Sequence, residues 1–138
     1  MSAEQSSNSP ATLEENLLQV LVQMKTQGQL LAAVLCTPDG LPLAAVESEA
    51  SHEVLAGLSS LFADVARRSE QLMEWNGVEE VSLVNEKGLR IVTRQFKDDE
   101  QYYILVVLVP ANQTYRKVTN LAIKKLRELL RRPSPSDT

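Results

Sequence analysis

The sequence has few of the residues that build disulfide-linked or metal-bound scaffolds. It contains one cysteine and one histidine, so Cys36 has no partner for an intramolecular disulfide. The two side chains together also fall short of the three or four ligands that hold a zinc ion. No apolar run approaches the roughly 18 residues of a membrane-spanning helix, because the longest run, residues 104–109, has the length of a strand. Disulfide scaffolds, metal sites and membrane spans are therefore not expected.

Phosphate-binding loops and catalytic clusters are missing as well. None of the five glycines stands in a GxxxxGK or GxGxxG pattern, so a nucleotide cofactor is not expected. As a catalytic base His52 would need a nucleophile and an orienting group beside it, and no matching triad is recognisable in the sequence, so we interpret it as a surface histidine. The acidic residues at positions 98–100 lack the further oxygen ligands that a hard cation needs. We expect no catalytic residues, no cofactor and no metal, and hence a protein that is not an enzyme.

Charge is distributed unevenly along the chain. The formal net charge is −4 and the pI about 5.0, which argues against non-specific nucleic-acid binding because such binding needs a basic surface. Residues 110–138 nevertheless hold seven of the 14 basic residues and two of the 18 acidic ones. A solvated outer face of a basic last helix is the simplest interpretation. Contact of that helix with a partner stays open, and contact with an anionic membrane is less expected.

One domain is expected between two tails. The length of 138 residues is that of one ordinary domain, about 100 to 200 residues. Ser, Asn, Pro and Gln are frequent in residues 1–11, and Pro and Ser in residues 132–138, a composition typical of disordered tails. Residues 1–11 also lack a basic segment followed by an apolar run, unlike a secretory signal. We expect a folded domain over residues 12–131 and a cytoplasmic location.

Turn and capping residues predict the first half of the fold. Thr12 has the spacing of a capping box with the glutamate three residues later, and it begins an amphipathic helix that ends before Gly28. Two apolar runs joined by a Pro-Asp-Gly turn at residues 38–40 predict a β-hairpin. The first run, residues 30–36, does not alternate with polar residues. Both faces of that strand are therefore expected to be covered.

The second half begins with a long helix from Ser51 to Trp75. After it the apolar period changes to two, and short connections between the runs predict an antiparallel meander. The last run is nearly all apolar and is expected to be covered on both faces. A helix of about residues 114–131 follows three strands, which are expected at residues 78–84, 88–96 and 101–109.

These elements predict an α/β (α+β) three-layer sandwich in the order αββαβββα. Consecutive strands with tight turns pair antiparallel, so the sheet has five antiparallel strands. Two of these strands are covered on both faces, which requires helices on both sides of the sheet. The long middle helix is expected on one face and the two terminal helices on the other.

The long middle helix has two distinct faces. Large apolar side chains gather on one face, and we expect that face to pack in the core; its members are Val54, Leu55, Leu58, Leu61, Phe62, Val65, Leu72 and Met73. A row of smaller side chains, Ala56, Ser60 and Ala63, lies opposite and is continued by Arg67. Small side chains let another backbone approach closely. The row is thus either a solvated face or a contact surface for another molecule.

Three stretches of the sequence resemble the Roadblock domain, also called the dynein light-chain seven family, and its bacterial MglB branch. They are LLAAVLCTPDGLPLAA, then GVEEVSLVNEKGLRIVTR after the long helix, and YYILVVLVP. The resemblance extends over about residues 13–131. The longin and profilin-like folds share the same plan of sheet and helices.

The resemblance implies a homodimer, or a dimer with a Roadblock paralogue, in which the middle helices lie side by side and the third strands pair. On this chain the implied interface consists of Ala56, Ser60, Ala63, Arg67, Val78, Val81 and Leu83. It also implies a non-enzymatic platform that binds and regulates a small Ras-like GTPase. Such a platform promotes GTP hydrolysis without contributing an arginine finger.

Two other functions stay open on the sequence alone. An adaptor subunit would tether a larger complex whatever the nucleotide state of any partner. A small-molecule sensor would hold a ligand between the sheet and the terminal helices. Nucleotide-dependent binding separates the adaptor from a GTPase regulator, and thermal stabilisation by a ligand identifies a sensor.

Overall fold

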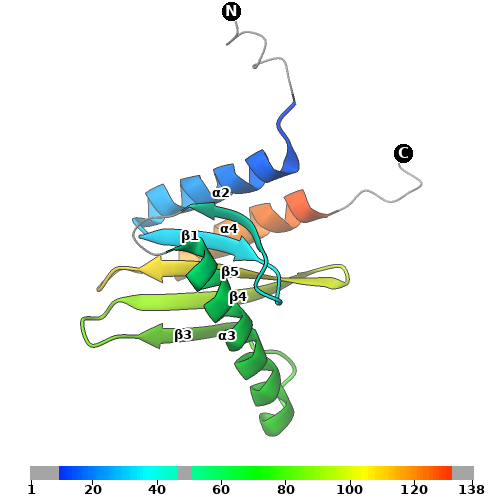
Figure 1. Ribbon diagram of the computed structural model, residues 1–138, viewed down its shortest axis with the longest axis vertical. Coiled ribbons are helices and arrows are strands. Elements are labelled where there is room, and N and C mark those ends of the chain that lie inside the picture. The colour runs from blue at the N-terminus through cyan, green and yellow to red at the C-terminus, as the bar shows by residue number, and fades with distance from the viewer. Residues whose placement is uncertain (1–9, 47–50, 132–138) are drawn as a thin grey trace, which may run out of the picture.

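A computed structural model describes residues 10–46 and 51–131 of the chain. Within these residues Figure 1 shows three helices and one five-stranded sheet. The elements are α2 (Leu13–Gly28), β1 (Ala32–Cys36), β2 (Pro42–Val46), α3 (His52–Met73), β3 (Glu80–Val84), β4 (Arg90–Asp98), β5 (Gln101–Val109) and α4 (Arg116–Leu130). The predicted order αββαβββα is confirmed. The predicted tail at residues 132–138 and most of that at residues 1–11 lie outside the described residues.

The sheet has the strand order β2-β1-β5-β4-β3, and every neighbouring pair is antiparallel. The two strands without polar alternation, β1 and β5, lie next to each other in the interior of this order. All five side chains of β1 are completely buried. The expectation that these strands are covered on both faces is confirmed for β1 and for the middle of β5.

The helices form two layers, one on each face of the sheet. The helices α2 and α4 pack together and share one apolar cluster with the sheet, which includes Leu21, Leu105 and Leu126. The helix α3 crosses the other face and shares a second cluster, which includes Leu55, Val34 and Val106. Successive side chains of a central strand point to opposite faces of the sheet, so they belong alternately to the two clusters. The three-layer sandwich predicted from the sequence is confirmed.

The starts of α2 and α3 are capped by side-chain hydroxyls, whereas the end of α2 differs from the prediction. The hydroxyl of Thr12 accepts a hydrogen bond from the amide of Glu15 at 3.1 Å, and Ser51 caps α3 through the amide of Glu53 at 3.2 Å. Gly28 was expected just beyond α2, but it is the last helical residue. A Cβ atom there would lie 2.9 Å from Val118 Cγ1, so α4 packs against this glycine.

The helix α3 turns a different face to the sheet from the one predicted. Leu55 and Phe62 are buried as expected, but the other buried residues of the helix are small, namely Ala56, Ser59 and Ala66. Most of the predicted core face is exposed to solvent, and its exposed members are Val54, Leu61, Val65, Leu72 and Met73. The prediction of the core face was therefore wrong for these five residues.

The close approach of α3 to the β1–β2 hairpin explains this orientation. Gly40 has a φ of +90° in the hairpin turn, and a Cβ atom added to it would lie 3.1 Å from the carbonyl oxygen of Ala56. The Sγ atom of Cys36 in β1 lies 3.0 Å from the hydroxyl of Ser59. Large side chains do not fit at these distances, so the small-residue row faces the sheet. The apolar pattern of the sequence alone predicts that the face with the larger side chains packs in the core.

Candidate protein-interaction surface

A stripe of apolar side chains runs along the outer face of α3. Its members Val54, Leu58, Leu61, Val65 and Leu72 follow one another at intervals of four, three, four and seven residues, with Arg68 between the last two. This is the spacing of the a and d positions of a coiled coil. The side chain of Leu61 is 63% exposed and that of Leu72 is 82% exposed. The stripe has the pattern of a helix-packing seam that no element of the described chain covers.

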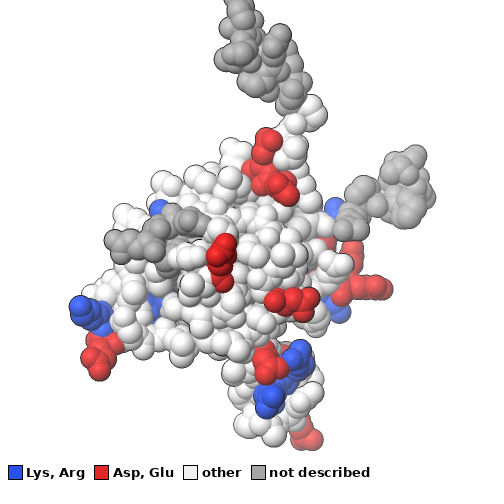
Figure 2. Space-filling model, in the orientation of Figure 1, with Lys and Arg blue, Asp and Glu red and all other residues white. Residues whose placement is uncertain are grey.

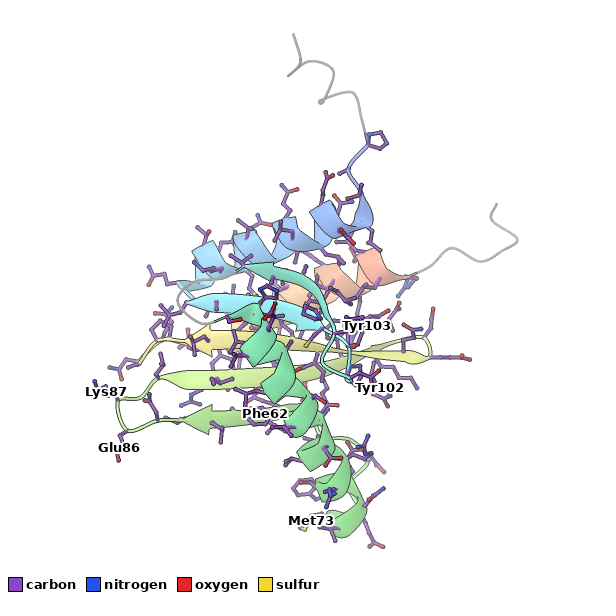
Figure 3. All side chains as sticks on the ribbon, in the orientation of Figure 1. Phe62, Met73, Glu86, Lys87, Tyr102 and Tyr103 are labelled. Carbon is purple, nitrogen blue, oxygen red and sulfur yellow. The ribbon has the colours of Figure 1, made fainter. Side chains whose placement is uncertain are left out.

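The last turns of α3 project beyond the edge of the sheet. In Figure 1 the helix crosses the sheet and continues past β3, and Figure 3 shows Phe62 over the sheet and Met73 on the projecting end. Met73 and Trp75 are both more than half exposed there. An apolar helix end without a sheet beneath it has a surface to bury against another molecule.

The strand β3 adds an unpaired edge beside this helix. It pairs with β4 on one side and lies at the end of the strand order. Leu83 is opposite Ile91, which packs in the cluster under α3, so Leu83 lies on the α3 face of the sheet. Its side chain is also exposed. We call the outer stripe of α3, its projecting end and Leu83 together the α3–β3 surface.

Charges border this surface near the projecting end of α3. Arg67 and Arg68 contact the two carboxylate oxygens of Asp64 at 2.5 and 3.1 Å, and the hydrogen bond from Arg67 lowers the pKa of Asp64. Figure 2 shows blue and red atoms gathered on this end, while the part of the face above it is largely white. The two arginines thus lie beside the apolar stripe and are held by a carboxylate of their own helix.

The implied interface residues differ in exposure. Arg67 and Leu83 are exposed. Val81 in β3 and Val78 just before this strand are half-buried, and Ser60 and Ala63 are half-buried on the side of α3 that faces the sheet. Ala56 is only 1% exposed within the chain, and its place in an interface with another molecule stays a prediction. The small row packs within the chain, and the large stripe was missed because apolar spacing is the same for core and for helix seams.

The cysteine and the acidic residues at positions 98–100 are the side chains best suited to catalysis or metal binding, and they lie in the core and in the β4–β5 turn. Cys36 is fully buried, and burial raises the pKa of its thiol. Asp98 is buried and Asp99 has a positive φ in the β4–β5 turn. Among the described residues no group of three His, Cys, Asp or Glu side chains is placed to hold a metal ion. None of the described helices is long and apolar enough to cross a membrane.

A buried arginine ties the beginning of β3 to α4. The guanidinium of Arg94 donates to Thr119 at 2.8 Å and to Asn120, both on α4, and to Glu79 at 3.2 Å just before β3. Its Nε atom lies 4.0 Å from Glu80. This side chain is 4% exposed. Residues at one end of the β3 edge are therefore fixed to the helix on the far side of the sheet.

Several solved structures have the same arrangement of sheet and helices as this chain. No protein-family model matches the sequence, and no curated protein matches it either. The gliding protein MglB of Thermus thermophilus superposes with a TM-score of 0.67 at 15% identity, covering 88% of this chain and 93% of that one. The Roadblock/LC7 domain from Streptomyces avermitilis superposes with a TM-score of 0.67 at 14% identity, covering 83% and 94%. The chain has the Roadblock fold.

A third structure agrees with this assignment. Myxococcus xanthus MglB superposes with a TM-score of 0.68 at 14% identity, covering 88% of this chain and 90% of that one. The match spans most of both chains. The Roadblock resemblance of the sequence is therefore confirmed at the level of the fold.

Proposed function

We propose that the protein is a non-enzymatic homodimer whose α3–β3 surfaces form a platform for a small Ras-like GTPase. The observation that carries the proposal is the exposed apolar stripe of α3 beside the unpaired edge of β3. A protein that remained monomeric would leave Leu61, Leu72 and Met73 in water, and an apolar patch of this kind is typical of an interface. The Roadblock resemblance of the sequence supports the GTPase as partner.

In the proposed dimer the α3 stripes of two copies pack against each other and the β3 edges pair. This two-fold arrangement is self-complementary, because each copy supplies the same stripe and the same edge. In this dimer the projecting end of α3 packs on the sheet of the partner copy, and the paired β3 edge is protected from pairing with other chains. Arg68, between Val65 and Leu72 in the stripe, then lies at the contact of the two helices. Arg67 lies off the stripe and is exposed, so it is available to an acidic partner surface.

The platform would act on the GTPase by differential affinity. A dimer that binds the GTP-bound switch conformation more tightly than the GDP-bound one shifts the population toward the former. An arginine finger from this chain is not part of the proposal. Asp64 holds both Arg67 and Arg68, whereas a finger has to reach the transferring phosphate.

The dimer is tested by analytical ultracentrifugation of the full-length protein at micromolar concentration. We expect twice the 15.3 kDa mass of the chain. The variant Leu61→Asp places a charge in the stripe and should be monomeric. Leu18→Asp is the matched control, because Leu18 is an exposed leucine on α2 across the sheet, and it should stay dimeric. A monomeric wild-type protein, or a dimeric Leu61→Asp variant, would refute the proposed interface.

The GTPase is tested by binding of Ras-like GTPases from the same organism, each loaded with GDP or with a non-hydrolysable GTP analogue. We expect at least one to bind more tightly in the GTP form and to change its hydrolysis rate when the dimer is added. Equal binding in the two nucleotide states would favour the adaptor function. No binding to any of them would refute the platform while leaving the dimer intact.

A further inference from the structure

A groove runs between α2 and α4, on the opposite side of the sheet from α3. Its largest hollow has a volume of about 560 Å³ and lies between the end of α2 and the first half of α4. A smaller hollow shares Gln27, Val118 and Leu121 with it, and a third shares Gln23 and Lys125 with the second. The three follow one another along the contact between the two helices, and the middle one is narrow, with a volume of about 10 Å³. We call this feature the α2–α4 groove.

The floor of the largest hollow is apolar. Gly28, Val118 and Leu121 line it, and Gly28 permits the close contact because a Cβ atom there would lie 2.9 Å from Val118 Cγ1. Leu121 follows the apolar spacing of α4, but its side chain is 47% exposed. The core contacts of α4 are made instead by its other apolar residues, among them Ala122, Leu126 and Leu130. Leu121 thus exposes about half of its apolar side chain at the centre of the groove.

The two walls of the groove carry different charge. Along α2 the wall is a neutral row of Gln19, Gln23 and Gln27 at intervals of four residues. Along α4 the wall of the largest hollow is basic, with Lys117 and Lys124 one turn before and after Leu121, whereas Glu128 lines the third hollow. The third lysine of this wall, Lys125, donates to Gln23 at 3.3 Å across the groove. None of the described residues that line the largest hollow is acidic.

We propose that the α2–α4 groove binds an acidic amphipathic helix of a partner protein. An apolar side chain of that helix packs on Leu121 and Val118, and carboxylates on its flank pair with Lys117 and Lys124. A helix laid into a groove between two helices is an established mode of peptide recognition. The charge complementarity speeds association and orients the bound helix toward the α4 wall.

The shape of the surface favours a helix over a membrane. The apolar stripe of α4 is buried against the sheet and α2, so it is not available to insert between lipids. The remaining apolar group, Leu121, lies within a hollow that a rod-shaped ligand enters more readily than a flat bilayer. The groove also stays accessible in the proposed dimer, because it lies across the sheet from the α3–β3 surface. The inference does not depend on the GTPase.

The test uses a fluorescein-labelled synthetic peptide with leucines at helical spacing and glutamates along one flank. Fluorescence anisotropy with the full-length protein should show saturable binding that weakens at higher salt. A peptide of the same composition, scrambled so that the leucines share no face, should not bind. The variants are Leu121→Ser and the pair Lys117→Glu with Lys124→Glu. Each should weaken binding about tenfold or more.

Matched controls separate groove binding from general attraction to charge. Lys87→Glu with Lys97→Glu makes the same change in net charge at exposed sites away from α4, and it should leave the affinity unchanged. A peptide with lysines in place of glutamates should bind the Lys117→Glu, Lys124→Glu variant better than the wild type. Thermal melts check that every variant is folded.

The contrary outcomes are distinct. No saturable binding of the acidic peptide, equal binding of the scrambled peptide, or equal weakening by the control variant would overturn the proposal. Anionic phosphatidylserine vesicles, tested by co-sedimentation, should not bind the protein. Binding to the vesicles through Lys117 and Lys124, together with failure to bind the peptide, would assign the groove to a membrane surface instead.

Discussion

The Sγ atom of Cys36 lies 3.0 Å from the hydroxyl oxygen of Ser59, in the contact between β1 and α3. The same hydroxyl donates to the carbonyl oxygen of Ala56 at 2.6 Å, so the polar atoms in this contact are satisfied within the chain. Both residues are completely buried. This pair shows that the small side chain of Ser59 faces the sheet, whereas Val54, Leu61 and Val65 on the outer side of α3 are exposed.

The Cys36 thiol is expected to be unreactive in the folded protein. Burial raises its pKa above the ordinary value of 9.0, and the reactive species is the thiolate. Labelling with Ellman's reagent at pH 8 should be slow in buffer and rapid in denaturant. Rapid labelling of the native protein would show that β1 is accessible.

The raised pKa of Cys36 also predicts a pH dependence of stability. The thiol is neutral in both states well below pH 9, so its contribution is fully present there. As the pH rises, the unfolded chain loses the proton first, and the free energy of unfolding falls until the folded thiol titrates too. Urea unfolding of Cys36→Ala should lack this part of the alkaline decline seen in the wild type. Identical slopes in the two proteins would contradict the shift.

Neighbouring positions on α3 are expected to respond in opposite directions. Ala56→Leu forces a large side chain into the buried cluster between α3 and the sheet and should lower the free energy of unfolding by about 1 to 3 kcal/mol. Gly57→Ala adds a Cβ atom with nothing within 4 Å, and it should raise stability by about 0.5 to 1 kcal/mol. Both are measured by urea unfolding in the Leu61→Asp background, where dimer formation does not contribute. Similar effects at the two positions would mean that α3 is oriented differently.

The buried Arg94 should be far more important for stability than an exposed arginine of the same cluster. Arg94→Ala leaves Glu80 and two polar groups of α4 without their cation, and we expect a loss of about 3 to 5 kcal/mol. Arg116 contacts Glu80 at 3.4 Å but is 59% exposed, so Arg116→Ala should cost less than about 1 kcal/mol. Urea unfolding compares the two. Equal losses would indicate that Arg94 is hydrated in solution.

The melting temperature should depend on protein concentration if the α3–β3 surface forms a dimer. Association stabilises the folded state by mass action, so the wild-type melting temperature rises with concentration. The Leu61→Asp variant should melt at one temperature over the same range. Differential scanning calorimetry at several concentrations measures both. A concentration-independent wild type would point to a folded monomer, in agreement with a negative sedimentation result.

Local signals in the sequence were sufficient for most of the fold. The hydroxyls of Thr12 and Ser51 mark the helix starts, Gly40 marks the hairpin turn, and the unbroken apolar runs mark β1 and β5 as central strands. Each of these signals depends on neighbours a few residues away, through capping bonds, positive φ or period. Such interactions are encoded in consecutive residues, so they can be recognised without a three-dimensional structure.

The sequence by itself determined the elements, their order and the absence of a recognisable catalytic motif. Only the tertiary structure decided which face of α3 meets the sheet, and it placed Ala56 against the sheet and Leu61, which was predicted in the core, in solvent. The physical reason is that an apolar stripe on a helix has the same residue spacing whether it packs in the core of its own chain or against another molecule. Which stripe is buried depends on the space above β1 and beside Gly40, where small side chains fit. The same reasoning applies to Leu121, whose spacing matches that of the buried residues of α4 but which lies exposed in the groove between α4 and α2.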